Sequence, residues 1–591
     1  MKIDKSIEII SNEEETLIIE NVKVTNDGGD NMSKPKKKVK GIYKTIIILL
    51  VLGIIGCLGY YFYGEHLKEL ERFFNMKESF YVGSDNTSAI LYDFEYNETS
   101  SVIRGNKIDK YINYEKDPNN MEYSKVKYND VDYLIKDNNL VKDYESVVFE
   151  KELFIKTSLN MYNDFDSLKL GSLIKKGETV SVIGFDELIN GEVSNYKITY
   201  KDNTGSISGD WLVKSKEIAS TYYNNESHKG IRSYSDSNAA EYLYYGDYQK
   251  GDFTDNVMPK TVYSLYLSGS SDHIGHVDEY IKFAKETKIN AFVIDIIDDG
   301  TISYPAKSMS IYSPSAAKHA LNSYDNFKAA IKKLNDAGFY TIARITAFKD
   351  TYFAKDHPEE CIARNGSPYY HQSAYWPSAY SRLDWEYKVA LGIEVIDDLG
   401  FNEVQYDYCR FPDSISVSVD YKNKYGETKA EAIQKFLIYA TENIHKHHGY
   451  VSCDVFGETS RGYVTQYGQY WPAMSNIADV ISAMPYTDHY GRDTDTWTNP
   501  KGIITTFAKE AYNMQQKTNS KAIVRTWITA YNTPWWNATV SYNADKIEQQ
   551  IRALYDNGLT GGYMTWIAYT YENRIKKFNA QKAAYSKEYL S

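Results

Sequence analysis

The sequence has few of the residues that stabilise small secreted or metal-binding domains. Cysteine occurs only four times among 591 residues, which is too few for a disulfide framework in a chain of this length. No two cysteines stand in a Cys-x-x-Cys arrangement, and no spaced set of histidines accompanies the acidic residues, so we expect neither a structural zinc site nor a metal cofactor. Cys409 and Cys453 lie in apolar, strand-like runs and are expected to be buried thiols.

Proline and glycine are not abundant either. With 13 proline and 35 glycine residues, the chain is neither collagen-like nor of low complexity. Hydrophobic residues make up 42%, enough to fill large cores, whereas a mean hydropathy of −0.52 excludes a polytopic membrane protein. The formal net charge of −12 would repel polyphosphate, so no nucleic-acid partner is expected. Tyrosine is in surplus, with 56 residues against 22 Phe; this suits sugar-binding surfaces, although a compositional bias explains the count equally well.

Long apolar runs are absent except for one, at residues 42–63. This run carries no charge after Lys44 and is long enough to span a bilayer as a helix, with three tyrosines at its end forming an interfacial belt. Lysines concentrate between Lys34 and Lys44, and the positive-inside rule places such a cluster in the cytoplasm. We therefore expect a disordered cytoplasmic tail at 1–41, a single-pass membrane helix at 42–63 and an extracellular remainder.

This apolar run has two other interpretations. A cleaved signal peptide has a shorter apolar run and a small-residue cleavage site, and neither is clear here. The tetrapeptide Ile54-Ile55-Gly56-Cys57 resembles the lipid-attachment box of bacterial lipoproteins. A long acidic tail ahead of the basic residues is foreign to that class, so the uncleaved anchor fits better.

An internal repeat follows the apolar run. Segment 123–128 is followed by Leu140-Val141-Lys142, and segment 195–200 is followed at the same spacing by Leu212-Val213-Lys214. An ungapped match at an offset of about 72 residues indicates duplicated modules. Short alternating strands between Asn, Asp and Gly turns predict a small all-β module at 78–142 and another at 150–218.

The second β module carries a family resemblance. Segments 158–162 (SLNMY), 171–177 (GSLIKKG), 179–183 (TVSVI) and 205–212 (GSISGDWL) are similar to the bacterial SH3 domain family. The resemblance implies binding of peptidoglycan; a spacer that holds the next domain away from the membrane is the alternative. Residues 219–258 are polar and turn-rich, which predicts a linker or a clamp onto the following domain.

From residue 259 to 591, apolar strands alternate with amphipathic helices. Eight β-then-α units predict an α/β fold of the (β/α)₈ TIM-barrel class, whereas a doubly wound sheet lacks support because no glycine-rich loop follows the first strand. The expected helices are 323–338, 428–449, 499–517 and 544–558. The expected strands are Val262–Leu267, Ala291–Ile297, Tyr340–Phe348, Glu403–Phe411, Tyr450–Phe456, Val480–Tyr486, Ile523–Tyr531 and Gly562–Ile567.

Polar residues gather where these strands end, which is where active sites form in this fold. If Tyr406 faces the surrounding helices, alternation along the strand turns Gln405 and Asp407 into the barrel. The same count turns Asp295, Arg344 and Asp454 inward. Since an unpaired carboxylate inside a barrel is costly, the alternative is a purely structural network of these aspartates with Arg344 and Arg525.

Three of these runs carry a second resemblance. Residues 291–300 (AFVIDIIDDG), 343–350 (ARITAFKD) and 403–413 (EVQYDYCRFPD) are similar to the glycosyl hydrolase domain of bacterial envelope proteins, whose barrels share a D-Y-x-R-F-P motif. The resemblance covers about residues 259–580. It implies a glycosidase acting on a wall or surface polysaccharide, and it assigns a role only to Asp407.

Glycoside hydrolysis requires two carboxyl groups, about 5–5.5 Å apart for retention and farther apart for inversion. We expect Asp407 to be the nucleophile or the carboxylate that stabilises the cation. Asp454 and Glu458 are the acid/base candidates. Glu458 is slightly preferred because a longer carboxyl near Phe456 could have its pKa raised by an apolar wall.

Other residues at the strand ends are expected to bind the sugar. An insertion at 351–382 is rich in aromatic residues that stack on pyranose rings, or that simply pack over the barrel end. The expected substrate-binding residues are Asp295, Asp298, Arg344, Arg410, Trp376, Tyr486, Asp488, Trp527 and Trp566.

The sequence thus predicts a membrane-anchored, outward-facing glycoside hydrolase that acts on a polysaccharide or a peptidoglycan glycan strand and needs no cofactor. The main rival is a non-catalytic, glycan-binding scaffold of the cell envelope. A metal-dependent deacetylase would require histidine ligands that the strand ends lack.

Overall fold

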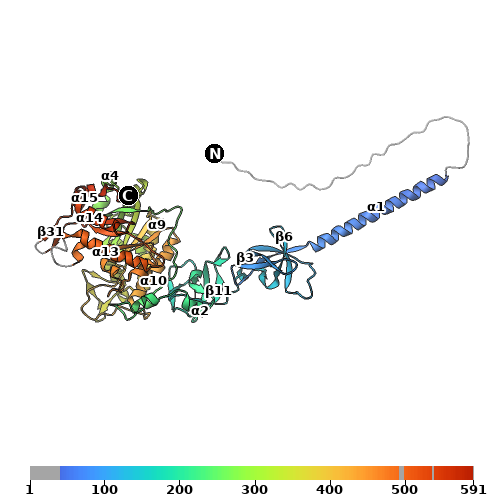
Figure 1. Ribbon diagram of the computed structural model, residues 1–591, viewed down its shortest axis with the longest axis horizontal. Coiled ribbons are helices and arrows are strands. Elements are labelled where there is room, and N and C mark those ends of the chain that lie inside the picture. Colours follow the sequence, from blue (N-terminus) through green and yellow to red (C-terminus); the bar gives the residue numbers. More distant parts are fainter. Residues whose placement is uncertain (1–39, 491–497, 536–537, 590–591) are drawn as a thin grey trace, which may run out of the picture. The chain divides into compact units, whose positions relative to one another are not determined.

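A computed structural model describes residues 40–490, 498–535 and 538–589 of the protein (Figure 1). Side chains at 40–48 and 534–539 are outside the described part. The expected tail at 1–41 therefore lies almost entirely outside the described residues. The chain divides into two compact units, one of residues 1–78 with 111–117 and one of residues 79–110 with 118–591.

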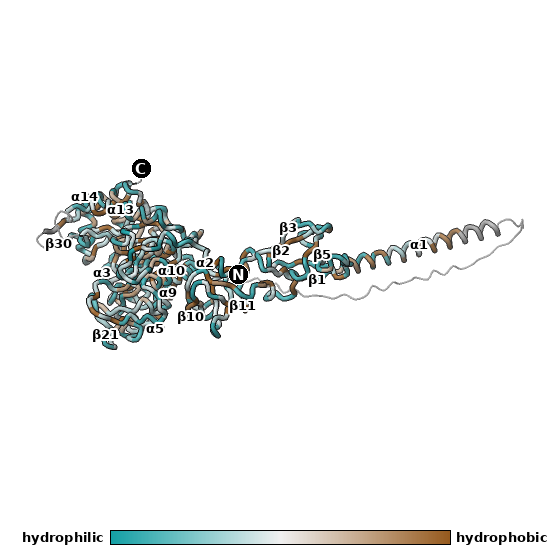
Figure 2. Tube along the Cα trace, turned by 60° about the horizontal axis from the view of Figure 1, so that its bottom comes forward, coloured by the Kyte–Doolittle hydropathy of each residue, from teal (hydrophilic) through white to brown (hydrophobic). Residues whose placement is uncertain are grey.

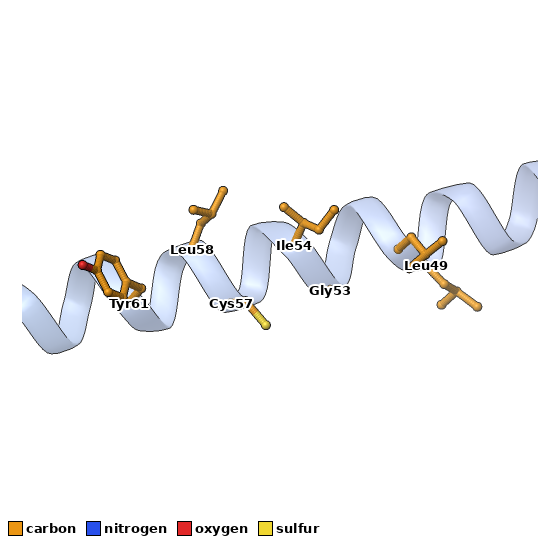
Figure 3. A pocket seen from close by; sticks show the side chains of 7 residues that line it. Leu49, Gly53, Ile54, Cys57, Leu58 and Tyr61 are labelled. Carbon is orange, nitrogen blue, oxygen red and sulfur yellow. The ribbon is translucent and has the colours of Figure 1, made fainter. Parts of the chain in front are cut away.

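The first unit contains the long helix α1 (Lys40–Phe74). Hydrophobic residues recur along it (Figure 2), and those with described side chains are exposed, such as Leu49 at 63% and Ile54 at 56%. Figure 3 shows these side chains along α1 together with Cys57. Within the described residues, no helix has an apolar stretch of the length and hydropathy needed to cross a membrane. The expected membrane helix at 42–63, whose first seven residues lie outside the described side chains, is thus not supported.

Two antiparallel sheets of seven strands follow, and they share one topology. The strand order in the first sheet is β3-β2-β6-β5-β4-β1-β7, and the order in the second is β10-β9-β15-β14-β11-β8-β16. The two orders become identical when the strands of the second sheet are renumbered from one. The repeated segments become equivalent strands, β5 with β14 and β7 with β16. Whether these modules are SH3-like stays a prediction. The strands are β1 (Lys77–Val82), β2 (Ser88–Tyr92), β3 (Glu98–Ile103), β4 (Lys107–Tyr111), β5 (Tyr123–Tyr128), β6 (Val131–Lys136), β7 (Leu140–Val141), β8 (Glu152–Ile155), β9 (Leu159–Tyr162), β10 (Leu170–Ile174), β11 (Thr179–Phe185), β14 (Asn195–Tyr200), β15 (Asn203–Ser208) and β16 (Leu212–Val213).

The remaining part is a mixed α/β structure around a nearly closed, parallel, barrel-like sheet. Its strands begin within a residue of the expected positions because each is a continuous apolar run buried on both faces. The order is β28-β27-β26-β25-β20-β18-β17-β32-β29. The bounds are β17 (Val262–Leu267), β18 (Ala291–Asp298), β20 (Tyr340–Thr346), β25 (Glu403–Asp407), β26 (Tyr450–Phe456), β27 (Val480–Met484), β28 (Ile523–Val524), β29 (Thr526–Thr529) and β32 (Gly562–Trp566).

The third and sixth strands end two residues earlier than expected, at Thr346 and Met484. Two other strands differ more, each for a local reason. The fourth strand ends at Asp407 rather than at residue 411 because Tyr408 has a positive φ of 49°, which breaks the extended conformation. The seventh strand is split at Arg525: β28 pairs with β27, and β29 pairs with β32 instead. The sheet is joined into a barrel by this change of partner.

Helices cover the outside of the sheet (Figure 1). Their apolar faces bury the outward side chains of the strands in one large core. Side-chain caps fix several starts: the Ser323 hydroxyl accepts from Asn326 N before α7, and Thr428 and Glu431 form a capping box at α10. The main helices are α4 (Val277–Lys285), α7 (Tyr324–Asp336), α9 (Arg382–Asp397), α10 (Lys429–His445), α13 (Pro500–Gln516), α14 (Ala544–Tyr555) and α15 (Tyr571–Tyr585).

The polar segment at 219–258 contacts the barrel through buried hydrogen bonds. Gln434 on α10 exchanges two of them with the backbone of Tyr244, at 2.7 and 2.8 Å. Lys250 donates to three backbone carbonyls at residues 475–478, and Gly251 N donates to Asp479 at 2.8 Å. Because these bonds satisfy backbone groups of both the segment and the barrel, the segment acts as a clamp.

The second β module also packs on the barrel helices. Glu442 of α10 accepts hydrogen bonds from the Tyr162 hydroxyl and from the Trp211 indole. Arg382 of α9 donates to Asn160 at 3.0 Å. These contacts join the module to the barrel as one packed body.

Candidate functional site

At the carboxyl end of the barrel, a single arginine lies close to the inward carboxyl groups. Arg344 is 3% exposed and lies on β20. Its Nη1 lies 2.6 Å from Asp295 and 3.3 Å from Asp298, and its Nη2 lies 2.5 Å from Asp407. Its Nε is 4.0 Å from Asp454. Four carboxyl groups from β18, β25 and β26 thus surround a single cation.

Within this cluster, Asp407 is the carboxylate that accepts two hydrogen bonds from Arg344. Its Oδ2 accepts from both Nε and Nη2 of Arg344, at 3.2 and 2.5 Å. Its Oδ1 accepts from the backbone N–H of Tyr408 at 2.5 Å. The left-handed conformation of Tyr408, unusual for an aromatic residue, ends the strand directly after this carboxylate. Charge-assisted bonds to both oxygens fix the side chain in place.

Asp454, on the neighbouring strand β26, has the opposite environment. It is fully buried, its Oδ1 accepts from the Trp527 indole N–H at 2.9 Å, and its Oδ2 accepts no hydrogen bond from any residue that the structure describes. Burial raises the pKa of Asp454 well above its usual value, and the nearby charge of Asp407 raises it further. The surroundings of Asp454 therefore favour its protonated form, whereas Asp407 forms an ion pair with Arg344.

Asp295 also tends toward the protonated form. The Tyr266 hydroxyl donates to its Oδ2, while Arg344 binds its Oδ1. Burial raises the pKa of Asp295 to about 7, despite the opposing charge of Arg344. Burial alone would lower the pKa of Arg344, but the charges of Asp407, Asp295 and Asp298 raise it above its ordinary value.

The raised pKa of Asp295 predicts a pH dependence of stability. The folded protein binds this proton up to pH of about 7, whereas the unfolded chain releases it near pH 3.8. Raising the pH through this window therefore removes stability, at a rate of order 1.4 kcal/mol per pH unit. We expect the urea midpoint of the wild type to fall between pH 4.5 and 7.5 by more than that of Asp295→Asn. Equal slopes in the two proteins would contradict the raised pKa.

A second buried ion pair lies deeper in the barrel. Nη1 of Arg525 contacts both oxygens of Glu403 at 2.8 and 2.9 Å, both residues are fully buried, and the Tyr340 hydroxyl donates to the same carboxylate at 3.0 Å. Arg525 therefore neutralises Glu403 and does not join Arg344 among the aspartates, contrary to the structural network considered from the sequence. Gln405 lies in the barrel interior, as alternation predicted, where it is fully buried and contacts Ser482.

The other acid candidate, Glu458, lies beyond β26 in a short 3₁₀ helix (Gly457–Arg461). Its carboxylate accepts from the hydroxyls of Tyr463 and Tyr467, at 2.8 and 2.5 Å. Both oxygens are thus already engaged outside the Arg344 cluster. Asp488 likewise accepts from the Tyr531 hydroxyl at 2.7 Å.

The expected sugar-binding residues divide into two groups. Trp566 lies 5.4 Å from the Arg344 guanidinium, and Trp527 and Tyr486 are buried in the same interior cluster. Arg410 instead pairs with Asp413 at 3.0 Å. Trp376 is 1% exposed and donates to the His371 carbonyl, so the structure places it in a small core of the insertion.

Tyr266 was missed by the sequence analysis. It lies at an inward position of β17, contacts Asp295 through its hydroxyl, and packs 4.5 Å from Trp566. The alternation of inward and outward side chains that predicts an inward Asp295 also predicts an inward Tyr266. Among the described residues, no group of three or more His, Cys, Asp and Glu is arranged to hold a metal ion.

Three solved structures show partial similarity to the chain. A hypothetical protein from Ruminiclostridium thermocellum is 27% identical over 32% of this chain and 97% of its own, with a TM-score of 0.28. The PgaB (BpsB) glycoside hydrolase domain from Bordetella bronchiseptica is 12% identical over 56% and 100%, with a TM-score of 0.40. An exo-β-N-acetylglucosaminidase from Vibrio harveyi is 12% identical over 56% and 55%, with a TM-score of 0.38. These low scores assign neither fold nor function.

A comparison with curated proteins found no match. A family model matches residues 264–571, from the first barrel strand to the start of the last helix. The matched region contains the Arg344 cluster and covers more than half of the chain. The protein therefore belongs to the family described as "Putative glycosyl hydrolase domain".

Proposed function

We propose that the protein is a glycoside hydrolase that cleaves a cell-wall or surface polysaccharide. Family membership supports the reaction class. The observation that carries the proposal is the pair Asp407 and Asp454 on adjacent strands: Asp407 forms an ion pair with Arg344, whereas burial raises the pKa of Asp454. Two carboxyl groups in such different surroundings are the usual basis for assigning acid and nucleophile roles.

The geometry gives each group a role. Asp454 donates its proton to the glycosidic oxygen while the bond from that oxygen to the anomeric carbon breaks, and the electron pair stays on the leaving oxygen. The negative charge of Asp407 stabilises the positive charge that develops on the anomeric carbon. Water then adds to this carbon, and its proton returns to Asp454. Arg344 holds Asp407 in place throughout by the ion pair between them.

The proposal is tested by incubating the full-length protein with peptidoglycan and with amino-sugar polymers and measuring new reducing ends. We expect release from at least one of these glycans. If the protein binds glycans across a broad panel but releases no reducing ends, it is a non-catalytic scaffold and the enzyme proposal fails.

The role of Asp454 predicts a leaving-group effect. Asp454→Asn should lower the hydrolysis of the polysaccharide by about 10²–10⁴-fold, because the proton donor is lost. An aryl glycoside with an acidic phenol needs no proton, so its cleavage should fall much less. Glu458→Gln is the matched comparison and should retain activity on both substrates. If instead Glu458→Gln loses polysaccharide hydrolysis and Asp454→Asn retains it, the proton donor is Glu458, the residue slightly preferred from the sequence.

We also propose that the barrel acts outside the cell on a membrane-tethered chain. The support comes from the lysine cluster before residue 42 and from the exposed leucines and isoleucines of α1. Cell fractionation tests this proposal directly. The protein should sediment with membranes, resist extraction by high salt, and be digested by protease added to intact protoplasts; recovery in the soluble fraction would overturn it.

A further inference from the structure

We propose that Trp527 is a positioning residue that holds Asp454 so that its acidic proton faces the glycosidic bond. This inference rests on the proposed function, in which Asp454 is the proton donor. The sequence predicts that Trp527 is one of the substrate-binding residues. Its contacts point to a different role.

Several contacts together fix the position of the Trp527 indole. Trp527 lies on β29 and is 1% exposed. Its ring packs edge-on against Trp566 at 5.9 Å and Tyr266 at 6.2 Å. Its Nε1 reaches Asp454 Oδ1 at 2.9 Å. With two rings and one hydrogen bond fixing it, the indole cannot rotate without losing packing on both sides.

The split in the seventh strand puts Trp527 in this place. Up to Val524 the strand pairs with β27, and from Thr526 onward it pairs with β32. Trp527 is therefore in register with Met564 on β32 while it donates to Asp454 on β26, a strand that is not its neighbour in the sheet. The hydrogen bond crosses the interior of the barrel.

The chemistry of the indole then fixes where the proton resides. An indole N–H can only donate, so Asp454 Oδ1 must act as an acceptor. The carbonyl oxygen of a neutral carboxyl is its better acceptor, so this bond favours the acidic hydrogen on Oδ2. This is the oxygen that lies 4.0 Å from Arg344 Nε and accepts no hydrogen bond within the described part of the chain. Trp527 thus leaves the proton on the buried oxygen that faces Arg344.

After proton transfer the same bond has a second effect. Asp454 becomes a carboxylate, and a hydrogen bond to a charged acceptor is stronger than one to a neutral acid. Trp527 and Arg344 favour this charged form, whereas burial, Asp407 and Glu403 oppose it. The Tyr486 ring lies buried in the same cluster. Removing the indole N–H should therefore make Asp454 a weaker acid and leave its conjugate base less stabilised.

Trp527→Phe tests this, because phenylalanine keeps an aromatic ring and removes the N–H. We expect kcat on the polysaccharide to fall about 10–100-fold with little change in KM, and the alkaline limb of the pH profile to move up by about 0.5–1 pH unit. Cleavage of an activated aryl glycoside should fall less. Trp471→Phe is the matched control: Trp471 is also fully buried and donates its N–H, but to Gln515. An unchanged pH profile in Trp527→Phe would overturn the proposal.

A second readout needs no substrate. In protein labelled with ¹⁵N-tryptophan, the Trp527 indole resonance, identified by its loss in Trp527→Phe, should shift with pH and stop shifting in Asp454→Asn. If it shifts but no glycan is cleaved, the proposed function fails while the coupling of Trp527 to Asp454 stands. If it does not respond to Asp454→Asn, the positioning role is lost whatever the activity.

Discussion

Asp407→Asn should abolish polysaccharide hydrolysis, with a fall in kcat of about 10³-fold or more. The substitution preserves the shape of the side chain but removes the negative charge that faces the anomeric carbon in a buried site, where preorganised charge has its largest effect. It also leaves Arg344 with one carboxylate fewer, so the site becomes more positive as the sugar becomes cationic. Initial rates of reducing-end release measure the effect.

Controls separate this loss from misfolding. Asp336→Asn makes the same chemical change on the exposed side of α7, where the aspartate pairs with Lys332, and it should leave the rate unchanged. The thermal midpoint of Asp407→Asn should be reported alongside, since Asp407 is also part of a buried ion pair. Full activity in a folded Asp407→Asn protein would remove Asp407 from the mechanism.

Among the substitutions proposed here, Arg525→Met should cause the largest fall in the free energy of unfolding. The substitution leaves the Glu403 carboxylate fully buried without its cation, and breaking such a pair typically costs about 3–5 kcal/mol. A fall of roughly 5–10 °C in the thermal midpoint is expected. Calorimetry or circular dichroism would measure it.

The double variant Glu403→Met with Arg525→Met is the decisive comparison. Replacing both charges by apolar side chains of similar size removes the unpaired carboxylate, so most of the lost stability should return. A double variant as unstable as the single one would show that the strand break at Arg525, rather than the ion pair, requires the arginine. The Tyr340 hydroxyl would lose its acceptor in that variant, which sets a small residual loss.

The sequence predicted the barrel strands well because their signal is local. Each is a short apolar run between polar turns, and alternation along them correctly turned Asp295, Arg344, Asp407 and Asp454 inward. Alternation requires an unbroken strand. It could not be counted across Arg525, where the strand changes partner, and so the pairing of Arg525 with Glu403 was not foreseen.

The contacts and the burial of a side chain were harder to predict from the sequence than the side of the strand that it faces. Glu458 was preferred for its longer side chain, but two tyrosines that follow it in the chain engage its carboxylate. The burial of Trp376 depends on how the insertion folds over itself, and composition contains no information about that. A hydrogen bond between Trp527 and Asp454 requires the three-dimensional register of β26 with β29 across the barrel, which no single-strand pattern encodes.

The closure of the sheet has a consequence for biosynthesis. Thr261 at the start of β17 donates to the carbonyl of Thr560, which lies 299 residues later in the chain. The first strand of the barrel therefore has a free edge until the segment 299 residues later has left the ribosome. Such long-range pairing is slow and exposes apolar strands to aggregation. A chain that stops before β32 cannot pair both edges of β17, so β32 decides whether the roughly three hundred residues before it become a folded domain.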